Sequence, residues 1–489
     1  MSFQTLFDTA ADQRRATLLG FGVIILNLLV LIALLSAPTP HAARLANLYY
    51  LAASTGIGFW LYISNPPLYL GFVWWVWFLS PFIRRLADYQ LGAFTPPKEA
   101  LILLTPFVVT SLCIFTVFRH GRALLQLHAV PFLLCMLGVF YGFLVGLPLI
   151  GPFDATISLL EWITPLLLGF HVMVLWRQFP QHRRIIRTTF ITSAFVLGTY
   201  ALIQFFFLPA WDRLWMIGSK MTSIGHPEPF EVRVFSMLNA PGPFATTLIP
   251  GLLLLFESRT LMGKLTAVPG YLGFLLSLVR SAWGAWMLGM LYLVWRLSGR
   301  LRVRLVALTV VMAIAVVPVA MMGEISEVTG QRVETLGTIG DDGSLAAREG
   351  MYRAATIDAL TNPLGEGLGS EIFDSGFVTI LWQLGWVGGS LYLGGLLWLI
   401  WSAVLSPKAV LPDQFTIILA ATALGYFANL SFGTEHVEIA GCVMWSFLGL
   451  IVASRRYHTA TMSPEEHLPS EQTPASSPPD ARDPSPVTA

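Results

Sequence analysis

Long apolar stretches alternate with short polar segments along most of this 489-residue chain. Many stretches approach 20 residues, the length of a helix that crosses the hydrocarbon of a bilayer. The pattern therefore predicts an all-α, polytopic membrane protein with about fourteen transmembrane helices. The predicted spans are 16–37, 47–64, 67–83, 99–118, 128–149, 155–176, 185–208, 240–257, 264–279, 282–298, 302–322, 385–404, 413–430 and 438–453. Because only Asn65 and Pro66 separate the second span from the third, this pair could instead form one broken or re-entrant element.

The membrane domain is predicted to occupy residues 1–453, and the composition changes abruptly after it. Residues 454–489 are rich in Pro, Ser, Thr and acids and contain few large apolar side chains. Such a segment cannot bury enough apolar surface to fold, so we expect a disordered cytoplasmic tail.

The distribution of arginine predicts the orientation, because basic loops remain in the cytoplasm. The clusters that agree with one another are Arg14 and Arg15; Arg177, Arg183, Arg184 and Arg187; Arg296, Arg300, Arg302 and Arg304; and Arg455 and Arg456. Both termini are therefore expected in the cytoplasm, and two long loops, 209–239 and 323–384, on the outer face. Arg84 and Arg85 fall on that outer face, so either the orientation fails locally or these arginines are held there for a purpose.

Composition narrows the class of protein. With 55% hydrophobic residues, 12% charged residues and a mean hydropathy of +0.68, the chain is no ordinary soluble enzyme. A net charge of +1 gives no basis for nucleic-acid binding. Cys113, Cys135 and Cys442 lie in apolar runs and are expected to be buried thiols. Because no zinc-type or Walker-type motif occurs, we expect neither a metal nor a cofactor.

The most polar stretch between apolar spans begins at Arg348 and ends near Gly385. Arg353 can pair with Glu349, four residues earlier on the same face of a short helix. Arg348 has Tyr352 at that spacing and no acid, so it is the stronger candidate ligand for an anion.

A glycine-rich sequence, NPLGEGLGS, follows at 362–370. Its glycines permit positive φ and close backbone approach, as a turn lying against a substrate requires, although a loose turn has the same composition. Asp374 comes next, either at the site or as the N-cap of the following helix.

Two further arginines are expected at the outer boundary of the membrane. Arg280 lies in SLVRSAWG between two apolar runs, and it either snorkels to the headgroups or faces an anionic group. Arg233 precedes NAPGP at 239–243, an irregular entry into the membrane that is tolerated where the backbone faces protein or a polar cavity. Because guanidinium groups bind phosphate through a planar fork, several arginines around one site favour a pyrophosphate ligand.

His436 lies in the short outer loop SFGTEHVE, beside Glu435 and Glu438. A neighbouring carboxylate raises the basicity of an imidazole, which suits a general base. An ordinary loop histidine without a catalytic role fits the same sequence.

The order of these segments resembles a known family. The succession RVFS, NAPGP, SLVRSAWG, REGMYR, NPLGEGLG, DSG and LGWVGG is similar to the bacterial O-antigen ligase and polymerase superfamily. Within that superfamily the chain most resembles the exopolysaccharide polymerases, and PFIRRLAD at 81–88 is also similar to that branch.

The resemblance implies glycosyl transfer from undecaprenyl-pyrophosphate-linked glycans at the periplasmic face of the bacterial inner membrane. It implies no metal, and it implies a flippase and a chain-length regulator as partners. By this resemblance Arg280 and Arg348 bind the pyrophosphate, with Arg233 and Arg353 as weaker candidates, and His436 and Asp374 serve the acceptor hydroxyl. Asp374 stands where many ligases have histidine, which favours a polymerase.

Three alternatives remain. A ligase that transfers glycan to lipid A core would share nearly every residue named above. A polyprenyl-phosphate-sugar glycosyltransferase would carry an acid in its first outer loop, and residues 38–46 contain none. A flippase or exporter of lipid-linked oligosaccharide would place ionisable groups midway along its spans, whereas these charges cluster at one face.

Overall fold

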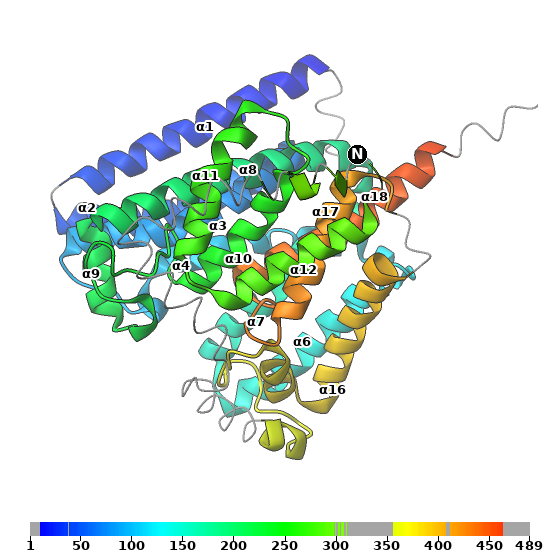
Figure 1. The fold of residues 1–489 in the computed structure, drawn as a ribbon. Helices are drawn as coiled ribbons and strands as arrows, with labels where there is room; N and C mark the ends of the chain where they lie inside the picture. Colours follow the sequence, from blue (N-terminus) through cyan, green and yellow to red (C-terminus); the bar gives the residue numbers. More distant parts are fainter. Residues whose placement is uncertain are drawn as a thin grey trace, which may run out of the picture.

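The computed structural model describes residues 10–37, 39–297, 356–406 and 411–462, together with isolated residues between 299 and 310. In these residues the regular structure is helical, apart from one isolated bridge between Gly225 and Val232 (Figure 1). The α-helices are α1 (Ala10–Ser36), α2 (Pro40–Ser64), α3 (Pro66–Leu91), α4 (Leu101–Ser111), α5 (Ile114–His120), α6 (Val130–Leu149), α7 (Pro152–Val174), α8 (Phe179–Phe207), α9 (Ala210–Ser219), α10 (Pro241–Leu254), α11 (Leu261–Leu276), α12 (Arg280–Arg296), α16 (Gly376–Ile400), α17 (Gln414–Asn429) and α18 (Glu438–Met462).

Eight helical stretches of the described residues are long and apolar enough to cross a membrane, and α10, α11 and α17 are shorter apolar helices. The all-helical membrane class predicted from the sequence is therefore confirmed. The predicted total of fourteen spans stays a prediction, and the span 302–322 lies almost entirely outside the described residues.

Several boundaries differ from the predicted ones for local reasons. The second span begins earlier than expected, because Thr39 caps α2 and Pro40 occupies its first position. Asn65 ends α2 and caps α3 through its side chain, so the doubtful pair is two complete helices. The predicted span 99–118 is interrupted between α4 and α5. At the other terminus α18 continues to Met462, so the predicted tail boundary at 454 is too early, and 463–489 lie outside the described residues.

Small residues set the closest helix contacts. On α6, Gly138, Gly142 and Gly146 recur every four residues and face α16 and the turn before it. A methyl group on Gly138 would lie 2.5 Å from the Gly388 carbonyl oxygen, and one on Gly146 would lie 2.4 Å from that of Leu368. Helices packed this closely gain backbone contacts that larger side chains prevent.

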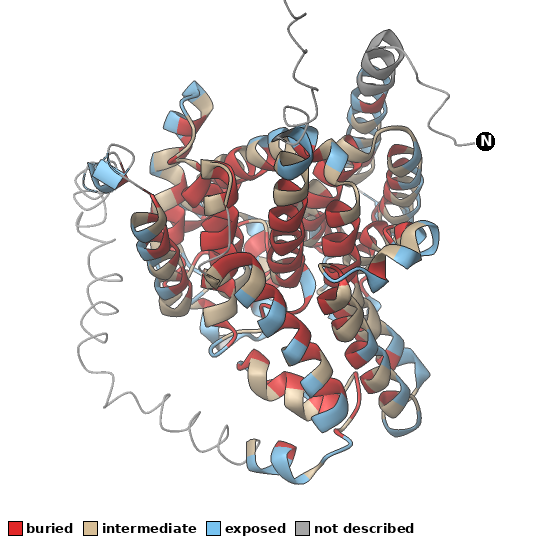
Figure 2. Cartoon of the chain, turned by 90° about the vertical axis from the view of Figure 1, so that its right-hand side faces the viewer, coloured by how far each residue is buried: buried red, intermediate tan, exposed pale blue. Residues whose placement is uncertain are grey.

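A glycine also allows α7 and α18 to pack closely, because a methyl group on Gly169 would lie 2.5 Å from the Trp445 carbonyl oxygen. Buried residues fill the centre of the bundle, and exposed residues lie on its outer faces (Figure 2). The exposed residues include many large apolar side chains. On α1, for example, Leu18, Leu26 and Leu29 are exposed, as expected for a surface that contacts lipid.

The helix packing gathers the polar loops at two ends. Helices α12 and α17 are antiparallel, because a methyl group on Gly425 would contact the Ala285 carbonyl and one on Gly289 would contact that of Ala421. Arg280 at the start of α12 therefore lies at the bundle end where α17 stops. We call this the loop end, which comprises residues 207–240, 277–280, 362–376 and 430–438. The opposite, basic end comprises residues 118–129, 176–187, 411–414 and 454–458.

Candidate functional site

The loop Leu430–Val437, between α17 and α18, forms the centre of the loop end. It is fixed to the start of α16, because the Gly376 N–H donates to the carbonyl oxygens of Leu430 at 2.7 Å and Gly433 at 3.0 Å. His436 is completely buried, and its ring packs edge-on against Trp162 with 4.5 Å between centroids. A methyl group on Gly376 would lie 2.9 Å from His436 Nδ1, so glycine is needed there.

His436 differs from the general base expected from the sequence. Among the described residues neither of its ring nitrogens has a hydrogen-bond partner. Burial lowers the pKa of the imidazole to about 3, so His436 is neutral at pH 7. The expectation that an adjacent carboxylate raises its basicity is therefore wrong, because burial dominates and the Glu435 carboxyl group turns toward Asn429.

Glu435, in the same loop, is an acid in an unusual environment. Its Oε1 accepts a hydrogen bond from Asn429 Nδ2 at 2.5 Å, while its buried Oε2 has no partner among the described residues. Burial raises the pKa of the Glu435 carboxyl to about 8, so the group is mostly protonated at neutral pH. Sequence reasoning treated Glu435 only as a neighbour of His436 and missed this.

A pair of acids lies near the same loop. Glu161 on α7 is close enough to Glu438, the first residue of α18, for their carboxyl groups to repel each other. Glu438 also has a positive φ of 52°, an uncommon conformation for a residue with a side chain. Sequence analysis missed Glu161, although an acid within an apolar span is itself a signal of function.

Asp374 is exposed and precedes Gly376 by two residues, so its segment lies beside the loop that carries His436. The N-cap position of α16 is occupied by Ser375, so Asp374 is not the cap of this helix. The two residues expected to serve the acceptor thus lie on adjoining segments, one exposed and one buried.

Arg233 and Arg280 both lie at the tight turn between α11 and α12. The Arg233 guanidinium donates to the carbonyl oxygens of Ser223 at 2.9 Å, Leu278 at 3.0 Å and Ser277 at 3.4 Å. Arg280 follows Leu278 by two residues and begins α12, half-buried. Arg348 and Arg353 lie outside the described residues.

The glycine-rich turn is packed against helices. Gly365, Gly367 and Gly369 have φ values of 76°, 82° and 96°. A methyl group on Gly365 would lie 2.4 Å from the Gly385 nitrogen, and one on Gly367 would lie 2.4 Å from the Gly146 Cα. These glycines are therefore required by the contact with α16 and α6, which excludes the loose turn.

Arg85, one of the two arginines that contradicted the orientation rule, belongs to a buried network. Arg85 Nη1 lies 2.6 Å from Asp212 Oδ1, and Nη2 donates to the Ser236 carbonyl at 2.6 Å. Asp212 Oδ2 accepts further hydrogen bonds from Tyr200 and Gln204. The network ties α3, α8 and α9 to the loop before α10.

Arg84 is held in a similar way. Its Nε lies 3.4 Å from Asp88 Oδ2, and its guanidinium stacks on Phe94 and donates to the Thr95 carbonyl. Of the two explanations offered for these arginines, the geometry favours the second: they are retained at this end by internal acids.

The described residues contain no group of three or more His, Cys, Asp or Glu side chains placed to hold a metal ion. Cys113, Cys135 and Cys442 are free and buried, as predicted. No family model, no curated protein and no solved structure matches the chain. Fold and side chains together define an all-helical membrane protein with a polar cluster at one end of its bundle.

Proposed function

We propose that this chain is a polymerase that joins undecaprenyl-pyrophosphate-linked oligosaccharide repeat units into an exopolysaccharide at the periplasmic face of the inner membrane. The observation that supports it most is the gathering of Arg233, Arg280, Asp374 and His436 at one end of the bundle. A cationic turn for the leaving group and a polar loop for the acceptor are the two requirements of this glycosyl transfer.

The arginines would act on the leaving group. As the bond between the anomeric carbon and the pyrophosphate oxygen breaks, its electron pair departs with undecaprenyl pyrophosphate. Arg280 would meet the growing negative charge, because fixed cations stabilise such transition states without reorganising. Arg233 donates to three backbone carbonyls, so it would mainly hold the turn that presents Arg280. Arg348 and Arg353 are further candidates for the same anion.

The loop would act on the acceptor. The acceptor hydroxyl oxygen forms the new bond to the anomeric carbon, and its proton passes to a base. Exposed Asp374 suits that role better than His436, which burial keeps neutral and weakly basic. His436 would orient the acceptor through a ring nitrogen.

Replacement of Arg280 tests the proposal in a strain that lacks its own copy of the protein. Arg280→Ala is expected to lower the rate of polymer formation by on the order of 10²-fold, the usual effect of losing one transition-state donor. Arg280→Lys should retain part of the activity. The matched control is Arg213→Ala, which removes an exposed arginine from the loop end and should leave polymer length unchanged.

The identity of the accumulated glycan distinguishes the alternatives, provided the variant protein is present in the membrane. Single repeats on the lipid carrier at the outer face, together with loss of long polymer, support the polymerase. Loss of glycan only from lipid A core indicates a ligase instead. Single repeats retained on the cytoplasmic side indicate a flippase or exporter, and unchanged polymer removes Arg280 from the site.

A further inference from the structure

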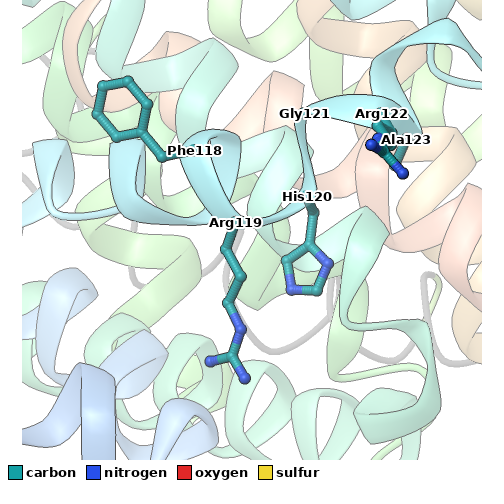
Figure 3. Close-up of a pocket in the computed structure, with 6 residues that line it drawn as sticks. All are labelled: Phe118, Arg119, His120, Gly121, Arg122 and Ala123. Carbon is teal, nitrogen blue, oxygen red and sulfur yellow. The ribbon is translucent and has the colours of Figure 1, made fainter. Parts of the chain in front are cut away.

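The basic end carries a hollow that the proposed reaction does not use. It has a volume of 430 Å³ and is lined by six consecutive residues, Phe118 to Ala123, where α5 passes into a short 3-10 helix, Gly121–Leu125 (Figure 3). Figure 3 shows the side chains of Arg119 and His120 extending to the same side, with Phe118 turned away from them. With Arg122, three basic side chains therefore line this open hollow.

Among the described residues, no acid pairs with the arginines of this hollow. Neither Arg119 nor Arg122 has a hydrogen bond or an ion pair with any described residue, and both are exposed. By contrast, Arg183 at the same end contacts Glu257 at 2.5 Å and Asp413 at 2.9 Å. The hollow thus presents positive charge that is available to an external anion.

The cationic surface continues beyond the hollow. His128, a few residues further along, lies 2.9 Å from Arg456 Nη1 through its Nε2. Arg456 and Arg177 both lie over the ring of Trp176, at 5.1 and 4.6 Å from its centroid. Tryptophan and arginine at the end of a membrane bundle mark the level of the headgroups.

Exposed apolar side chains flank the basic ones on the same short segment. Phe118 is 77% exposed, Leu125 75% and Leu127 74%. A site for a free anion has no need of such neighbours, whereas a lipid brings acyl chains together with its phosphate.

From this arrangement we infer that Arg119, His120 and Arg122 form a binding site for the phosphate of an anionic glycerophospholipid, with Phe118, Leu125 and Leu127 contacting its acyl chains. Basic hollows at the cytoplasmic level of membrane bundles bind anionic headgroups in this manner. The site lies at the opposite end from the proposed glycosyl transfer and does not depend on it.

Binding of short-chain phosphatidylglycerol to the purified full-length protein in a neutral detergent tests the inference. Affinity is measured by thermal shift, and bound lipid is counted by native mass spectrometry. The wild type should bind phosphatidylglycerol more tightly than phosphatidylcholine, and the difference should shrink as salt is added.

The variant is Arg119→Gln/Arg122→Gln. Because each arginine near an anionic lipid contributes on the order of fivefold in affinity, the double variant should bind roughly 25-fold more weakly. Arg119→Lys/Arg122→Lys should retain most of the affinity, which guards against a variant that fails to fold. Arg184→Gln, which removes an exposed arginine from the same end, is the matched control and should bind as the wild type does.

Three results would overturn the inference: equal affinity for the two lipids, an equal loss in Arg184→Gln, or inorganic phosphate binding as tightly as phosphatidylglycerol. The last result would identify a site for a soluble anion rather than for a lipid.

Discussion

Two buried polar clusters at the loop end differ in how many of their polar atoms have hydrogen-bond partners. Around Arg85, nearly every polar atom has a partner: the guanidinium meets Asp212 and a carbonyl, and the carboxylate accepts further hydrogen bonds. Around His436, polar atoms are buried without partners among the described residues, including both ring nitrogens and Glu435 Oε2.

The contrast separates structural from functional burial. A buried polar group without a hydrogen bond lowers the stability of the fold. The His436 cluster nevertheless keeps several such groups close together. The Arg85 cluster is a network in which most polar atoms are hydrogen-bonded, and it holds helices together. Under the proposed function, the His436 cluster is a site that a ligand completes.

The largest expected effect comes from breaking the Arg85 cluster. Arg85→Met leaves the Asp212 carboxylate buried without its cation, which should lower the free energy of unfolding by about 3–5 kcal/mol. Arg85→Met/Asp212→Leu should recover part of this loss, because no unpaired charge remains. Denaturant titration of the protein in detergent measures both variants. A loss in Arg85→Met as small as that of exposed Arg213→Met would show that the network does not hold the fold.

A smaller loss of stability is expected when the turn that supports the His436 cluster is displaced. Gly146→Ala would place a methyl group 2.4 Å from the Leu368 carbonyl oxygen and push away the turn that leads to Asp374. We expect a loss of about 1–3 kcal/mol, as is typical of overpacking. In the control Gly284→Ala the new methyl group meets nothing within 4 Å, so stability should hold or rise slightly. Equal effects of the two substitutions in the same titration would argue against a rigid turn.

Per pH unit, the smallest effect is a pH dependence that sets Glu435 apart. Its pKa in the folded protein is raised to about 8 from an ordinary value of 4.5, so between these values the folded state binds more protons than the unfolded state. The stability that this group contributes is therefore present below pH 4.5 and is lost as the pH rises to about 8, by at most about 1.4 kcal/mol per pH unit.

Glu435→Gln should remove that slope, and its unfolding free energy should exceed that of the wild type above pH 8. The measurement is the same titration repeated from pH 5 to pH 9. Glu231→Gln, at an exposed acid of the same end, is the control and should keep the slope. A slope that persists in Glu435→Gln would assign the titration to another group.

Much of the fold could be predicted from apolar length alone, because a bilayer requires long helices and permits few alternatives. The predicted helix boundaries were less accurate where capping residues set the start of a helix, as Thr39 and Pro40 do for α2. They were also less accurate where the predicted span is interrupted between α4 and α5. The repeat Gly138, Gly142, Gly146 was readable as a helix-packing motif and was overlooked.

The candidate site was harder to predict, because sequence neighbours are not neighbours in space. Glu435 is adjacent to His436 in the chain yet turns to Asn429, and burial lowers the pKa of the imidazole instead. Arg85 seemed misplaced until its partner Asp212, far away in sequence, was seen beside it. Such pairings depend on tertiary contacts that no local pattern encodes.

The contact between α7 and α18 has a consequence for biogenesis. Helix α7 presents Gly169 to α18 and Trp162 to the loop before α18, and both partners are synthesised only after α8 to α17. Until then this close-fitting face has no partner, and the histidine that packs on Trp162 has not yet been made. Assembly of the polar cluster therefore has to wait until α17 has been made, so a chain truncated before His436 would insert into the bilayer without forming it.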